Sequence, residues 1–254
     1  MPKPNCVGCG EVIVAASREH VLPQWLAKEV FIPKATLNHY LRDENENKDQ
    51  LLRKHGLNNF AVKNVCATCN NGWMSLLEDR AKPFILELMN EEANIHAGLR
   101  AEGMLAVSRW AAKTAFMIAS VQKDHLELPW QLFQNMKLDE NQGPDGCFVF
   151  VGQFLAMSKG FTYACLRDHR PHDVKAVVHL RVGFSIKRIH LVVVIPLVEG
   201  ERILKTDPRF HTPLWPIGLR TVPRSTQTPA RFTSFARAQY FLTNLIEAGL
   251  VQRG

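Results

Sequence analysis

Hydrophobic positions along this chain follow a helical rhythm in its first half and a strand rhythm in its second half. From Asn70 to about Met89, Trp73, Leu76 and Leu77 recur at helical spacing, with an asparagine at the start that can cap the helix. A shorter helix is expected from Pro23, because proline is tolerated in a first turn. Two further helices are expected over 105–121 and 233–250.

Later runs are short and rich in β-branched and aromatic residues, which is typical of strands. They occupy 147–151, 162–165, 176–182 and 190–198, and one more short strand is expected over 12–15. The stretch 34–58 is polar and is expected to be an exposed loop or insertion. These patterns predict the α+β class, with a module at 1–80, a helical bridge at 81–125, and a mostly antiparallel α+β domain at 126–254.

The composition suits a soluble globular protein, because 46% of the 254 residues are hydrophobic and 22% are charged. No apolar run reaches the roughly 18–20 residues that a membrane span needs. The first residues lack the hydrophobic core of a secretion signal, so the expected location is cytoplasmic. Disulfides are rare in that compartment, and closely spaced cysteines are therefore read first as metal ligands.

The net charge of +7 suits a polyanionic partner such as nucleic acid. Residues 1–80 are almost neutral, with 10 Lys+Arg against 9 Asp+Glu, whereas residues 81–254 hold 21 against 15. The surplus gathers between Arg167 and Arg188 and between Arg202 and Arg237. A phosphate-binding surface is therefore expected in the C-terminal domain, with an ordinary solvated basic face as the alternative.

Two cysteine pairs are the strongest chemical signal. Cys6 and Cys9, like Cys66 and Cys69, are separated by two residues, so one tight turn can present two thiolates to one ion. Gly10 allows a positive φ at the end of the first turn. Four thiolates predict a closed, tetrahedral and structural zinc site. Cys147 and Cys165 lie in strand-like runs and are expected in the core.

Glu19 and His20 lie between the two pairs in the sequence. An imidazole titrates near neutral pH and can act as the general base that activates a water. The Glu19 carboxylate can hold a hard cation such as Mg²⁺ or Mn²⁺. Asn70, directly after the last cysteine, is the natural second ligand, unless it serves only as a helix cap. Because neighbouring side chains of a strand point to opposite sides, a bend near Pro23 is expected to bring Glu19 and His20 together.

These residues resemble the HNH, or His-Me finger, endonuclease family. The resemblance covers residues 5–80 and runs through the first cysteine pair, Glu19-His20-Val21-Leu22-Pro23, and the second pair with Asn70 and the sequence that follows it. It implies a ββα-metal module that hydrolyses phosphodiester bonds, with DNA as the expected substrate and RNA as the alternative, because such a site contacts the phosphate and not the sugar. It also implies that His20 is the general base, that Glu19 and Asn70 hold Mg²⁺ or Mn²⁺, and that the four cysteines hold zinc.

The chain departs from the family pattern in two places. The asparagine or histidine that orients the base has no clear equivalent, and Asn58, Asn59 and Asn64 remain candidates. Residues 42–55 are an insertion. The alternative to a nuclease is a zinc-stapled module that binds nucleic acid or a partner and whose nuclease site is inactive. His179, His190 and His211 have no ligand cluster around them, so residues 126–254 are expected to recognise a target, a protein partner or another copy of the chain. Bacterial nucleases of this type are often associated with defence.

Overall fold

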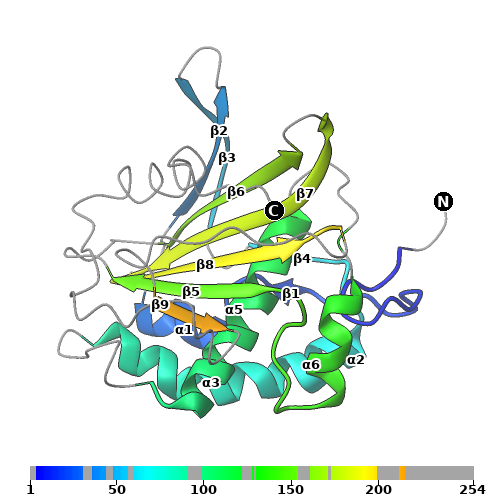
Figure 1. Ribbon diagram of the computed structural model, residues 1–254, viewed down its shortest axis with the longest axis vertical. Coiled ribbons are helices and arrows are strands. Elements are labelled where there is room, and N and C mark those ends of the chain that lie inside the picture. The colour runs from blue at the N-terminus through cyan, green and yellow to red at the C-terminus, as the bar shows by residue number, and fades with distance from the viewer. Residues whose placement is uncertain are drawn as a thin grey trace.

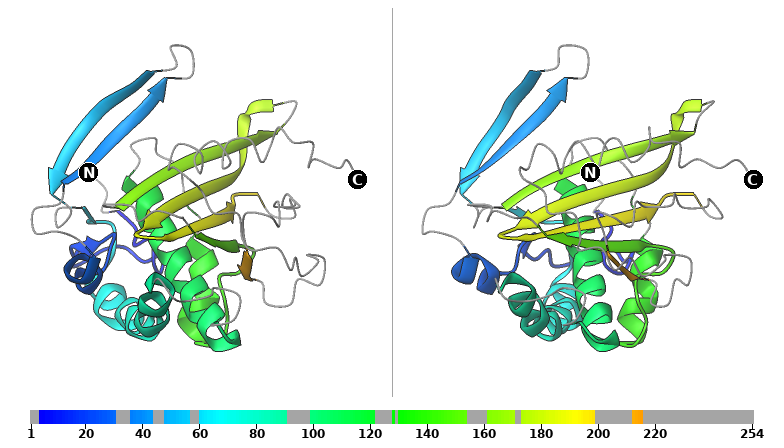
Figure 2. Two further views of the ribbon diagram at one scale, coloured as in Figure 1. Left: turned by 90° about the vertical axis from the view of Figure 1, so that its left-hand side faces the viewer. Right: turned by 60° about the vertical axis from the view of Figure 1, so that its left-hand side comes forward.

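The computed structural model describes residues 4–30, 36–43, 48–56, 60–90, 99–121, 128, 130–153, 161–170, 173–198 and 212–215. Helices lie on one side of a five-stranded antiparallel sheet, as Figures 1 and 2 show. The mixed helix and sheet content confirms the α+β class that the two hydrophobic rhythms predicted.

The helical segments agree with the sequence pattern. They are α1 (Gln24–Val30), α2 (Ala67–Cys69), η2 (Asn70–Met74), α3 (Ser75–Met89), α5 (Ala101–Val121), η3 (Trp130–Phe133) and α6 (Gln134–Leu138). The predicted helix at 70–89 is confirmed, although it begins three residues earlier. The predicted helix at 105–121 is also confirmed and begins at Ala101. The helix expected at 233–250 lies outside the described residues.

The main sheet has the strand order β6-β7-β8-β5-β9, and every neighbouring pair is antiparallel. Its strands are β5 (Phe148–Gln153), β6 (Phe161–Arg170), β7 (Asp173–Ile186), β8 (Ile189–Pro196) and β9 (Thr212–Trp215). The four strand-like runs of the sequence lie within β5 to β8, apart from one or two residues at the ends of two runs, so the prediction of an antiparallel sheet is confirmed. The strand expected at 12–15 is reduced to an isolated bridge between Asn5 and Val12.

The polar stretch that was expected to be a loop contains a hairpin instead. Strand β2 (Thr36–Asp43) pairs with β3 (Lys48–Gly56), and the hairpin projects from the body of the protein (Figures 1 and 2). Near its end, Arg42 faces Asp49 and Asp43 faces Lys48 across the strands.

Helix α5 lies at the centre of the hydrophobic core. It packs against the sheet, where the Trp110 ring meets Phe184 edge-on at a centroid distance of 5.8 Å. One continuous cluster of buried side chains extends from Cys6 near the N-terminus to Leu214 in β9. The segment boundaries expected near residues 80 and 125 stay predictions, but the core itself is shared by all three segments.

A buried arginine ties α5 to the turn after α6. Arg109 is 8% exposed, and its guanidinium donates hydrogen bonds to the carbonyl oxygens of Met136, Asp139 and Gln142 at 2.5–2.7 Å. These carbonyls belong to the end of α6 and the following turn, where a helix leaves acceptors without intrahelical partners. The side chain therefore holds the turn in place.

Replacing Arg109 with methionine should lower the free energy of unfolding by about 3 kcal/mol, because hydrogen bonds from a charged donor contribute more than neutral ones and the carbonyls would remain buried. Arg80 provides the control, since its ion pair with Glu140 in the same turn is half-exposed. Arg80→Met should cost about 1 kcal/mol or less. Urea unfolding curves measure both values, and equal losses would contradict the assigned role of Arg109.

Candidate metal centre and histidine site

The first cysteine pair forms a tight turn at the N-terminus. The amides of Cys9 and Gly10 both donate to the carbonyl of Cys6, at 3.3 and 2.7 Å. Gly10 has a φ of 77°, which confirms the positive φ expected there. The amide of Gly8 donates to the Cys6 sulfur at 3.4 Å. A Cβ atom on Gly8 would lie 2.6 Å from the terminal methyl group of Met74, so the turn packs closely on η2.

The second pair begins helix α2. Cys66 is extended, with φ −76° and ψ 155°, and its sulfur accepts a hydrogen bond from the Cys69 amide at 3.4 Å. Cys66 is thus the helix cap, and the expectation that Asn70 or Asn71 caps the helix was wrong. The sequence pattern missed this cap because a thiol takes the place of the usual hydroxyl or carboxylate. The amide of Cys66 also donates to the Cys6 sulfur at 3.2 Å, which joins the two turns.

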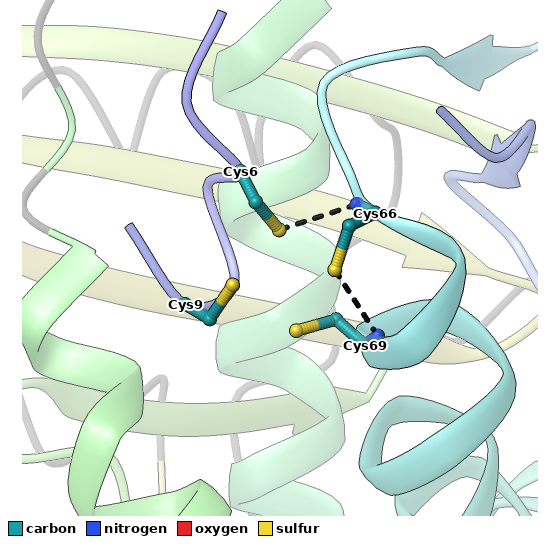
Figure 3. A group of neighbouring side chains, drawn as sticks. All are labelled: Cys6, Cys9, Cys66 and Cys69. Atoms are coloured by element: carbon teal, nitrogen blue, oxygen red, sulfur yellow. Dashed lines mark hydrogen bonds between the residues drawn. The ribbon is translucent and has the colours of Figure 1, made fainter. Parts of the chain in front are cut away.

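The four cysteine sulfurs form one cluster (Figure 3). They all lie within 4.8 Å of one another, and none forms a disulfide. A zinc ion with bonds of about 2.3 Å in a tetrahedron needs sulfurs about 3.8 Å apart, so only a small contraction is required. The cluster could therefore hold a metal ion such as zinc, as the spacing predicted.

The sulfurs differ in their electrostatic environment. Burial raises the pKa of the Cys6 thiol despite amide donors from Cys66 and Gly8. Burial also acts to raise the pKa of Cys66, but hydrogen bonds from the Cys69 amide and the neighbouring thiols outweigh it and lower the pKa. Cys66 is therefore more easily converted to a thiolate than Cys6, and a bound cation would favour the thiolate form of all four cysteines.

His20 is held in a short strand that pairs with the segment leading to the second cysteine pair. Strand β1 (Glu19–His20) pairs with β4 (Ala61–Val62), with His20 opposite Ala61. The amide of Val21 donates to the Phe60 carbonyl at 2.9 Å, and that of Ser17 to the Val65 carbonyl at 3.0 Å. The chain on both sides of His20 is thus bonded to the segment that ends at Cys66. The imidazole is half-buried.

Glu19 points into the protein. It is 4% exposed, and its Oε1 atom forms an ion pair with the ammonium of Lys113 on α5. The same ammonium bonds Oε1 of Glu78 on α3 at 2.6 Å. Since Glu19 and His20 are consecutive in an extended strand, their side chains leave it on opposite faces. The chain bends at residues 21–22, directly after His20, and the expectation that this bend brings the two side chains to one site stays a prediction.

The pKa shifts of Lys113 and Glu78 reflect both their burial and their ion pairing. Burial alone would lower the pKa of Lys113, but the carboxylates of Glu78 and Glu19 raise it above its ordinary value. Burial raises the pKa of Glu78, although the ammonium acts in the opposite direction. Sequence reasoning missed Lys113 and Glu78. The available signal was a lysine as the one charged residue in the largely apolar sequence from Trp110 to Ala119, where an unpaired charge would be costly.

Asn70 lies at the junction between α2 and α3. Its backbone is helical, with φ −63° and ψ −54°, and its side chain is half-buried. The helix kinks two residues later at Gly72. Among the candidates for orienting the histidine, Asn58 and Asn59 lie outside the described residues. Asn64 is described, and its Oδ1 atom is buried without a hydrogen-bond partner among the described residues.

The second half of the chain contributes buried polar groups to the sheet. Arg181, His179 and His190 are at most 5% exposed, so within 167–188 Arg181 does not belong to an exposed basic face. His190 Nδ1 lies 2.8 Å from the Ser185 hydroxyl oxygen, also in the core. Cys147 is buried, as expected, and Cys165 packs half-buried against the core. His211 and the basic residues from Arg202 to Arg237 lie outside the described residues.

Comparison with known proteins finds no match for this chain among family models, curated proteins or solved structures. The resemblance to the His-Me finger family therefore depends on the cysteine pairs, Glu19-His20 and Asn70. Of the helices that the structure describes, none combines the length and the apolar character that a membrane crossing requires.

Proposed function

We propose that this protein is a metal-dependent endonuclease that hydrolyses phosphodiester bonds, in DNA rather than RNA. His20 acts as the general base, Glu19 and Asn70 hold Mg²⁺ or Mn²⁺, and zinc bound by the four cysteines stabilises the site. The observation that carries the proposal is the cysteine cluster together with the β1–β4 pair. Backbone hydrogen bonds in and beside the β1–β4 pair tie the segment around His20 to the chain that ends at Cys66. Asn70 follows four residues after Cys66, next to the cysteine cluster.

In this proposal β1, β4 and the helix that starts at Ala67 are the two strands and the helix of a ββα-metal module, with α1 and the β2–β3 hairpin inserted between the two strands. Strand β1 carries His20, β4 pairs with it, and the helix that starts at Ala67 carries Asn70. A divalent ion in such a module stabilises charge on the phosphate and the leaving oxygen, while the histidine accepts a proton from the attacking water. Since Cys66 already caps the helix, the Asn70 side chain is not needed for that purpose.

The ion pair of Glu19 with Lys113 limits how the Glu19 carboxylate can bind a metal ion. Its Oε1 atom contacts the Lys113 ammonium, so a metal ion held by this carboxylate would use the second oxygen. The same contact favours the alternative function, a zinc-stapled module that binds nucleic acid or a protein without cutting. In that case Glu19, Lys113 and Glu78 form a purely structural ion-pair cluster.

Asn70 provides a direct test with a matched neighbour. Asn70→Ala should raise the Mn²⁺ concentration needed for half-maximal cleavage of plasmid DNA, because it removes an oxygen ligand, and excess Mn²⁺ should partly restore the rate. Asn71 is exposed and adjacent, so Asn71→Ala should behave as the wild type. Zinc should not replace Mn²⁺ at this site, since oxygen ligands suit harder ions.

The result that contradicts metal binding by Asn70 is an unchanged Mn²⁺ dependence in Asn70→Ala at an unchanged zinc content. Cleavage that persists after Mg²⁺ and Mn²⁺ have been removed would contradict the metal-dependent mechanism as a whole. Salt-dependent binding of DNA with no cleavage under any of these conditions would favour the binding module.

A further inference from the structure

Lys113 is the most deeply buried charged group among the described residues. Its side chain is fully enclosed in the middle of α5, where the neighbouring Ala112, Phe116 and Met117 are also fully buried. Its ammonium contacts one carboxylate from β1 and one from α3. One cation therefore joins three elements that are far apart in the sequence.

This arrangement is not explained by packing. An aliphatic side chain of similar length would fill the same space in the core without a desolvation cost, and replacement of buried ion pairs by apolar groups is often neutral or stabilising. The ammonium instead fixes the positions of two carboxylates, because an oxygen of each must lie within bonding distance of the same nitrogen. Glu19 and Glu78 are the groups that it orients.

Glu19 immediately precedes His20 in a strand of only two residues. So short a strand has few hydrogen bonds of its own, and anchoring one of its side chains restricts the backbone of both residues. The Lys113 contact holds Glu19 on the buried face of β1, and strand alternation then directs His20 to the other face. The orientation of His20 thus depends on a residue outside the first eighty.

From this geometry we propose that Lys113 is a positioning residue for the His20 site, acting through Glu19. This inference rests on the proposed nuclease function for its kinetic consequences, but not for its structural ones. The ammonium holds Oε1 of Glu19, and this contact sets the strand that presents His20. Helix α5 is accordingly part of the site, although it lies outside the segment that resembles a nuclease.

The test uses the full-length zinc-loaded protein and a charge-matched variant. Lys113→Met alone would leave two buried carboxylates without a counter-ion and would destabilise the fold. It is therefore combined with Glu78→Gln, which keeps the net charge of the cluster at −1. Glu78→Gln alone is the control, because it retains the contact between Lys113 and Glu19. Zinc content and circular dichroism establish that each variant is folded.

The double variant should lower kcat for plasmid cleavage about tenfold or more, whereas Glu78→Gln should stay within about threefold of wild type. In a Glu19→Gln background the same two changes should alter kcat less than about twofold, because residues that act through one contact are not additive. A tenfold loss that persists in the Glu19→Gln background would overturn the inference, since Lys113 would then act by another route.

A second readout is independent of cleavage. The imidazole signal of His20, assigned in carbon–proton NMR spectra by its loss in His20→Ala, should shift or broaden in the double variant but not in Glu78→Gln. An unchanged signal, together with an unchanged kcat, would overturn the positioning role. If wild type and His20→Ala cut DNA equally, the nuclease proposal fails, while a shifted His20 signal still supports the action of Lys113 on this strand.

Discussion

Cys66→Ser should release the bound metal and unfold the segment that contains His20. Structural zinc sites supply apparent free energies of roughly 10–16 kcal/mol, which is as large as the whole stability of an ordinary domain. Serine at this position can still cap α2, because serine is a favoured cap residue, so the substitution removes the thiolate and keeps the helix start. The loss of stability can then be assigned to the metal.

Cys165→Ser is the matched control, since Cys165 is half-buried in β6 and lies outside the cysteine cluster. Metal analysis of the wild type and of Cys165→Ser should give about one zinc per chain, and Cys66→Ser should have almost none. Thermal unfolding should show the same order, and a strong chelator should convert the wild type to the behaviour of Cys66→Ser. Well-folded wild-type protein without zinc would contradict the structural role of the cluster.

The features that sequence patterns predicted are local. Two cysteines separated by two residues need only one turn to meet an ion, and Gly10 has the positive φ that this turn requires. The helices at 70–89 and 105–121 and the strands β5 to β8 were predicted because their periodicity is set by near neighbours. The hairpin β2–β3 was missed because its polar, charged sequence indicates a loop and lacks the alternating apolar pattern of a strand.

The histidine site was only partly predictable for the same reason. Glu19 and His20 stood out because they lie between the cysteine pairs, but the partner of Glu19 is Lys113, which is distant in the sequence. The pairing of one lysine with two carboxylates depends on how α5 packs against β1 and α3. No local spacing contains that information. The helix cap was missed for a different reason. The capping hydrogen bond is accepted by a cysteine sulfur, whereas a cap residue usually accepts it with a side-chain oxygen.

His20→Ala should abolish most of the proposed cleavage activity without affecting the fold. The imidazole is not one of the four zinc ligands, and it is half-buried rather than part of the packed core, so zinc content and stability should remain near wild type. The rate should fall by roughly 10²–10⁴-fold, the usual contribution of general acid–base catalysis. Binding of DNA should persist, because contacts to phosphate do not require the base.

The cleavage rate of supercoiled plasmid, measured side by side for wild type and His20→Ala with Mg²⁺ or Mn²⁺, tests the account most directly. Both proteins should first be shown to carry the same amount of zinc. The proposal predicts nicked and linear products with the wild type and at least a hundredfold slower appearance of both with His20→Ala. Equal rates for the two proteins would exclude His20 as the catalytic base, and the absence of cleavage by either, on plasmid and on single-stranded substrates, would contradict the nuclease function.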